Sequence, residues 1–125
     1  MDFLISLCRR FAVVLSVSLL AIASLVFLPS PANAASYEVK MGGDNFMLIF
    51  DPKTLSVAVG DTVTFINNKA APHNVVFDGH PELSHKQMFF RPGESYEVTF
   101  DASGTYKFYC EPHRGAGMFG TITVE

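Results

Sequence analysis

The stretch TYKFYCEPHRGAGM, residues 105–118, joins a strand-like pattern to a cluster of side chains that can bind a metal ion. Successive side chains of a β-strand point to opposite faces. Tyr106, Phe108 and Cys110 therefore share one face, and Lys107 lies on the other. The apolar set predicts a strand that packs on a core and ends at a buried cysteine.

The rest of residues 37–125 also consists of strand-like segments. These short segments are rich in Val, Thr, Ile, Phe and Tyr and are separated by Gly, Pro, Asp and Asn. This pattern predicts an all-β sandwich or barrel of about eight strands. The expected strands are 37–41, 46–50, 54–59, 62–67, 74–77, 95–100, 105–110 and 120–124. The stretch 81–90 is the least strand-like and is predicted to be a loop or a single helical turn.

Residues 1–34 have the layout of a secretory signal peptide. Arg9 and Arg10 precede an apolar run over 11–28, and Ala32-Asn33-Ala34 offers a small-residue cleavage site. Cleavage after Ala34 would leave one domain, residues 35–125. The apolar run of about 18 residues is also long enough for an uncleaved membrane anchor, which is the alternative. Arg before an apolar run fits both the general and the twin-arginine export routes.

The charge and the cysteine content exclude some classes of function and of cross-link for this domain. Residues 35–125 carry seven Lys and Arg against eleven Asp and Glu, a net charge of −4, which argues against a nucleic-acid binder. Cys8 lies in the leader, so Cys110 is the only cysteine of the domain and has no internal disulfide partner. Cys110 is therefore either a buried thiol that packs as a small apolar side chain or a thiol with a function.

Cys110, His113 and Met118 form the pattern CxxHxxxxM, which puts three donor side chains on one loop after a strand. His73 is the natural fourth donor from another predicted strand. Two imidazoles, a thiolate and a thioether are the ligands of blue-copper sites. Singly, a Met is more often core filling and a His more often a hydrogen-bonded loop residue, but the combination predicts copper. His80 and His85 are the histidines left over, and we assign them to the surface.

Four segments, PHNVVF (72–77), LSHK (83–86), PGES (92–95) and YCEPHRGAGM (109–118), resemble the plastocyanin family, and especially its cyanobacterial members. The resemblance covers nearly all of residues 35–125. The CxxHxxxxM spacing alone is shared with other small cupredoxins such as pseudoazurin, whereas CEPHRGAGM is far more specific.

This resemblance implies a cupredoxin fold, an eight-stranded Greek-key β-sandwich with one copper ion bound by His73, Cys110, His113 and Met118. It implies that Asn74 braces the ligand loop through hydrogen bonds. It also implies a soluble, monomeric one-electron carrier, not an enzyme and not inserted in the membrane, which takes electrons from cytochrome f and passes them to photosystem I. The expected location is the thylakoid lumen, with the periplasm as the alternative.

The resemblance further implies a flat apolar docking face around His113, with Pro72 and Leu48 beside it. Tyr109 marks a second possible electron route, and Arg114 could orient an acidic partner. Phe46 departs from the glycine usual in the family, Phe119 replaces a commoner Val, and the short region 78–82 lacks the acidic run of land-plant members. A copper redox enzyme, a carrier that hands over copper and a metal-free interaction domain are the competing functions.

Overall fold

The structure is a computed structural model that describes residues 33–125. The predicted signal peptide lies outside the described residues, except for Asn33 and Ala34. Over the range 33–125, no helical segment has the length and apolar content needed to cross a membrane.

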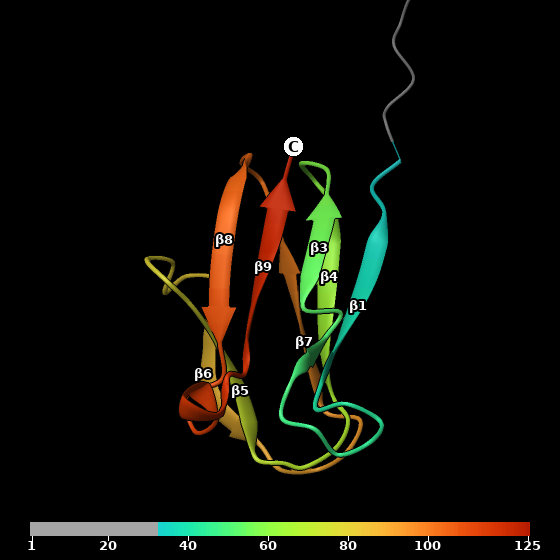
Figure 1. Ribbon diagram of the computed structural model, residues 1–125. Helices are drawn as coiled ribbons and strands as arrows, with labels where there is room; N and C mark the ends of the chain where they lie inside the picture. Colours follow the sequence, from blue (N-terminus) through green and yellow to red (C-terminus); the bar gives the residue numbers. More distant parts are fainter. Residues whose placement is uncertain (1–32) are drawn as a thin grey trace, which may run out of the picture. The chain divides into compact units, whose positions relative to one another are not determined.

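The described residues form two packed β-sheets (Figure 1). One sheet has the strand order β2-β1-β4-β7, and the other has the order β3-β9-β8-β5-β6. The strands are β1 (Ser36–Met41), β2 (Phe50–Asp51), β3 (Thr54–Val57), β4 (Thr62–Asn67), β5 (His73–Phe77), β6 (His85–Phe89), β7 (Ser95–Thr99), β8 (Gly104–Tyr109) and β9 (Phe119–Val124), with a 3₁₀ turn, η1 (Arg114–Ala116), before β9. The predicted all-β Greek-key sandwich is confirmed.

Two of the local predictions were wrong. Residues 46–49 form a turn instead of a strand, in which Phe46 has a φ of 65° and the Gly43 N–H donates to the Met47 carbonyl at 2.9 Å. Residues 85–89, predicted to be irregular, form β6. This strand is at the edge of its sheet and pairs only with β5, so Lys86 and Gln87 face solvent and no apolar alternation appears in the sequence.

Aromatic rings from both sheets fill the core. Phe65 of β4 lies 5.9 Å from Phe77 of β5 and 5.3 Å from Phe108 of β8, measured between ring centroids, and both pairs meet edge to face. Phe50 lies 4.8 Å from Phe108 in the same manner. All four rings are almost completely buried. Such edge-to-face pairs add about 0.5–1.5 kcal/mol each to the stabilisation from burial, so the two sheets are held in a fixed relative position.

The strand register brings distant parts of the sequence to one end of the sandwich. β5 and β8 are antiparallel, with Val76 opposite Tyr109, so the start of β5 at His73 lies beside the end of β8. β8 and β9 are also antiparallel, with Tyr109 opposite Phe119. The residues just before β5, just after β8 and just before β9 therefore meet at this end.

Candidate metal centre

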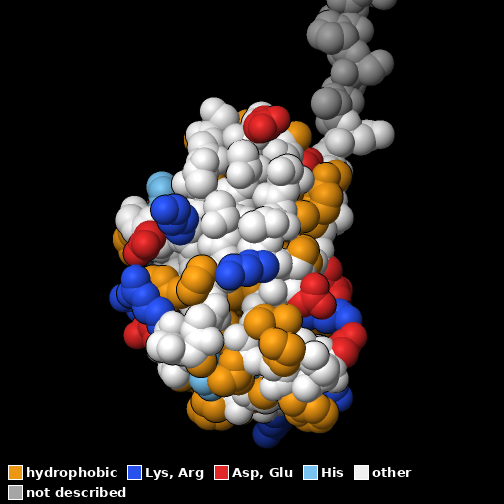
Figure 2. Space-filling model, in the orientation of Figure 1, with side chains coloured by type: hydrophobic (Ala, Val, Ile, Leu, Met, Phe, Trp, Pro, Cys, Tyr) orange, Lys and Arg blue, Asp and Glu red, His pale blue; other side chains and the backbone are white. Residues whose placement is uncertain are grey.

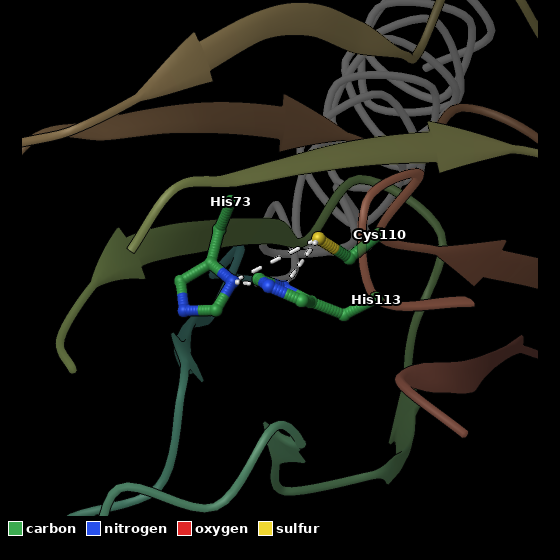
Figure 3. Close-up of side chains that lie close together, drawn as sticks. All are labelled: His73, Cys110 and His113. Atoms are coloured by element: carbon green, nitrogen blue, oxygen red, sulfur yellow. Dashed lines mark hydrogen bonds between the residues drawn. The ribbon is translucent and has the colours of Figure 1, made fainter. Parts of the chain in front are cut away.

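Three of the four predicted donor atoms meet at this end of the sandwich (Figure 3). The Cys110 sulfur lies 3.7 Å from His73 Nδ1 and 3.5 Å from His113 Nδ1, and the two Nδ1 atoms are 3.2 Å apart. His73 comes from β5, and the other two from the loop after β8. Residues about 40 positions apart in the sequence thus present one sulfur and two nitrogen atoms to a common point.

The size of this triangle fits a metal ion. For sides of 3.2, 3.5 and 3.7 Å, the point equidistant from the three atoms lies about 2.0 Å from each. Zn²⁺, for example, binds imidazole nitrogen at about 2.0–2.1 Å and thiolate at about 2.3 Å. A soft thiolate with two imidazoles in a trigonal plane is the donor set of a blue-copper centre. The three donor atoms therefore match a copper site in both spacing and chemical type.

The tautomer of His73 is set by the hydrogen bond that its Nε2 atom makes. His73 Nε2 lies 2.6 Å from the carbonyl oxygen of Lys69, which can only accept, so Nε2 carries the proton and donates. Nδ1 is then left with a free lone pair directed at the triangle. Burial lowers the pKa of His73, the Lys69 carbonyl raises it, and His113 lowers it further. The combined shift is downward, which keeps the ring neutral and ready to bind a metal.

Cys110 is shielded from solvent, and two backbone N–H groups donate hydrogen bonds to its sulfur. Burial raises the pKa of the Cys110 thiol, while the backbone N–H groups of Asn74 and His113 lower it and Glu111 raises it. Cys110 is a free and completely buried thiol. A bound cation would favour its thiolate form, since metal binding displaces the thiol proton.

The ligand loop folds back on itself. The Cys110 N–H donates to the Met118 carbonyl at 3.1 Å, and the Met118 N–H donates to the His113 carbonyl at 3.2 Å. Gly117, with a φ of 89°, ends η1 in the left-handed conformation that permits this return. Met118 is fully buried, and its backbone pairs with that of Cys110. Its thioether as a fourth ligand stays a prediction.

Asn74 bridges β5 and the ligand loop, as the resemblance implied. Its Oδ1 accepts the backbone N–H of Glu111 at 2.8 Å, and its Nδ2 lies 3.1 Å from the Lys86 carbonyl. Asn74 is fully buried although alternation would place it on the outer face, because all five residues of β5 are buried. These bonds fix the first residue after Cys110.

The turn at Gly42 contacts the site in a way that the sequence does not reveal. Gly42 has a φ of 87°, and a Cβ atom there would overlap the Lys69 carbonyl oxygen and lie 3.0 Å from His73 Nε2. The backbone therefore approaches the hydrogen bond of His73 too closely for any residue with a side chain.

The two remaining histidines lie apart from the centre. His80 Nδ1 contacts Glu82 Oε1 at 3.0 Å, and His85 Nδ1 lies 2.9 Å from the Gln87 carbonyl. Among the described residues, neither belongs to the group of donors that could share a metal with Cys110. Both residues are half-buried, and their assignment to surface roles stays a prediction.

Comparison with known proteins agrees with this geometry. Residues 37–125 match the family described as copper binding proteins, plastocyanin/azurin family. The chain is 49% identical to a plastocyanin of Prochlorothrix hollandica over 131 residues that cover both chains completely. It is 50% identical to a chloroplastic plastocyanin of Physcomitrium patens, over 86% of this chain and 67% of that protein.

A solved structure shows the same arrangement of strands. The oxidised plastocyanin of Dryopteris crassirhizoma aligns with a TM-score of 0.62 and 31% identity, covering 70% of this chain and 99% of the other. The aligned share of this chain is close to the share that forms the sandwich. Together with the family match over 37–125, this places the chain in the plastocyanin/azurin family of copper-binding proteins.

Proposed function

We propose that the chain is a blue-copper one-electron carrier in which His73, Cys110, His113 and Met118 hold a single copper ion. The observation that supports this most directly is the triangle of Cys110 Sγ, His73 Nδ1 and His113 Nδ1. A copper ion bound there would supply the one-electron chemistry by cycling between Cu(I) and Cu(II). The carrier moves an electron between proteins and transforms no substrate.

The residues around the centre suit this task because they hold the donors in place. Lys69 orients His73, Asn74 holds the loop next to Cys110, and the loop is closed by its own backbone bonds. Electron transfer is fast when the surroundings of the metal need little reorganisation. Burial of Cys110 and His73 excludes water, which also tunes the potential.

His113 is the point at which an electron would leave. Its side chain is only partly buried, unlike that of His73. Exposed apolar side chains lie on the loops at the same end, with Phe46 66%, Met47 54% and Phe90 67% exposed. Figure 2 shows hydrophobic side chains gathered at this end of the molecule. We expect a short-lived complex in which the partner covers this apolar end, with Leu48 and Pro72 at its border.

Arg114 adds a fixed positive charge beside this face. Its guanidinium lies 4.0 Å from the centroid of the Tyr109 ring, which holds the side chain next to the ligand loop. An acidic partner could accept a hydrogen bond from it, so Arg114 would orient the encounter and Tyr109 would mark a second route for the electron.

The expected partners follow from the plastocyanins that this chain resembles. We assign cytochrome f as the donor and photosystem I as the acceptor, with the thylakoid lumen as the location and the periplasm as the alternative. Residues 1–34 would be the signal peptide, cleaved after Ala34, and residues 35–125 the mature monomer. Mass spectrometry of the exported protein tests this cleavage, because an uncleaved anchor would retain the mass of residues 1–34.

The decisive experiment is an absorption spectrum of the protein with Cu(II). We expect an intense visible band from thiolate-to-copper charge transfer, absent in Cys110→Ser. Repeated reduction and oxidation should switch the band off and on without loss of metal. Release of copper on reduction would support a copper-delivery role, and absence of the band in the parent would support a metal-free interaction domain.

Stopped-flow kinetics with reduced cytochrome f and flash kinetics with photosystem I test the assigned partners. Both reactions should be fast at low ionic strength, and Arg114→Gln should slow them while leaving the visible band unchanged. Substrate turnover without a protein electron acceptor would instead favour a redox enzyme.

A further inference from the structure

Lys69 is the link between the metal centre and a surface loop. Its carbonyl accepts the hydrogen bond of His73 Nε2 at 2.6 Å, yet it lies in the irregular segment between β4 and β5, where Lys69 is exposed and Ala70 half-buried. Ala70, the next residue, has a φ of 57°, a conformation that residues other than glycine seldom adopt. Something outside this segment must therefore hold the carbonyl in its position.

Asn68 provides that support. Its backbone N–H donates to the Met41 carbonyl at 3.0 Å, and its side-chain Nδ2 donates to the Gly42 carbonyl, also at 3.0 Å. The same Nδ2 lies 2.8 Å from Asp44 Oδ1. Asn68 thus fastens the peptide that precedes the Lys69 carbonyl to the loop that follows β1.

The hydrogen bonds of Asn68 act at the point where the loop after β1 approaches the Lys69 carbonyl most closely. Gly42 is the residue whose backbone lies against the Lys69 carbonyl and His73 Nε2. The bond from Asn68 to the Gly42 carbonyl keeps these two segments together. Asp44 in turn is held by Lys40 Nζ at 3.1 Å, so one carboxylate ties Asn68 to β1.

We propose that Asn68, with Asp44 as its anchor, is a positioning residue for His73 that sets the strength of the hydrogen bond between His73 Nε2 and the Lys69 carbonyl. A hydrogen bond donated by a ligand imidazole raises the basicity of its other nitrogen. Loosening the bond would make His73 a poorer donor to Cu(II), so Asn68 also influences the reduction potential.

The first test uses the metal-free chain and is independent of the proposed function. Nitrogen–proton NMR spectra should show a slowly exchanging, downfield proton on His73 Nε2 in the parent. Asn68→Ala should increase its exchange rate at least tenfold, and Asp44→Ala should do so to a smaller extent. Asn45→Ala is the matched control, because it removes the same carboxamide group from the loop that Asn68 contacts, where Asn45 Oδ1 only accepts the Met47 N–H.

The second test uses the copper-loaded protein and rests on the proposed function. Asn68→Ala should raise the reduction potential relative to both the parent and Asn45→Ala. If Asn68→Ala does not fold, Asp44→Asn and Asp44→Ala replace it. The amide oxygen introduced by Asp44→Asn still accepts the hydrogen bond from Asn68, so the exchange of the His73 proton should stay slow in that variant and become faster in Asp44→Ala. Equal proton exchange in Asn68→Ala and Asn45→Ala, or in the two Asp44 variants, would overturn the proposal whether or not copper binds.

Discussion

The side-chain carboxamide of Asn74 binds Glu111 twice, since its Oδ1 accepts the Glu111 backbone N–H at 2.8 Å and its Nδ2 lies 3.2 Å from Glu111 Oε1. The two residues are 37 positions apart in the sequence. This pair joins the strand that carries His73 to the loop that carries Cys110 and His113.

Replacing Asn74 by Ala should therefore destabilise the protein even without metal. The change leaves the backbone N–H of Glu111 and the carbonyl of Lys86 without their present partners, at a cost of about 1–3 kcal/mol in the free energy of unfolding. Urea denaturation of the metal-free protein measures this cost. Gln87→Ala on the exposed side of β6 serves as the control, and an equally small effect of both changes would contradict the bracing role.

Gly42→Ala should cost more than Gly60→Ala. Both glycines have positive φ, 87° and 92°, but a Cβ at Gly60 meets no atom within 4 Å, whereas one at Gly42 meets the Lys69 carbonyl and His73 Nε2. Gly60→Ala should lose about 1 kcal/mol from backbone strain alone, and Gly42→Ala should lose more and also weaken metal binding. Thermal unfolding with and without Cu(II) compares them, and equal losses would show that the crowding at Gly42 relaxes freely.

Copper should stabilise the folded chain by an amount that rises with the logarithm of its free concentration relative to the Kd. At a free Cu(II) concentration 100 times the Kd, the expected gain in unfolding free energy is about 2.7 kcal/mol. Cys110→Ser should lose most of this gain, and Met118→Leu should keep part of it while changing the visible spectrum. His85→Ala, whose imidazole lies outside the donor cluster, should behave as the parent does. A large loss in His85→Ala would refute the proposed ligand set.

Acid stability should depend on Asp44. The hydrogen bond from Asn68, followed by the bond from Lys40, lowers the pKa of Asp44 below its ordinary value of 3.8. The unfolded chain then takes up the proton first, so the stabilising contribution is complete above that ordinary value and is lost as the pH falls through the lower folded value. Denaturation curves between pH 5 and pH 2 should show a shallower acid dependence for Asp44→Asn than for the parent. Identical slopes would contradict this.

The sequence was sufficient to predict the sandwich and the donor cluster because both follow from local signals. Alternation in β8 correctly buried Tyr106, Phe108 and Cys110, and the spacing of CxxHxxxxM placed His113 within reach of the thiol. Applied to β5, the same rule orients His73 correctly but does not show that Asn74 is also buried, since that depends on packing by the ligand loop.

Features that depend on contacts between distant backbone atoms left no sequence signal. A carbonyl such as that of Lys69 exists at every residue, so its role toward His73 cannot be read from the side chain. The strand at His85–Phe89 gives no such signal because two consecutive residues of this edge strand, Lys86 and Gln87, are both exposed and only Phe89 is fully buried.

The position of β9 has a consequence for folding. This strand lies between β3 and β8 and contributes Ile122 and Val124 to the core, so the five-stranded sheet is divided until β9 has paired with both neighbours. The sandwich cannot close before β9 is in place. Loss of β9 would separate β3 from the group formed by β8, β5 and β6, instead of removing one edge strand.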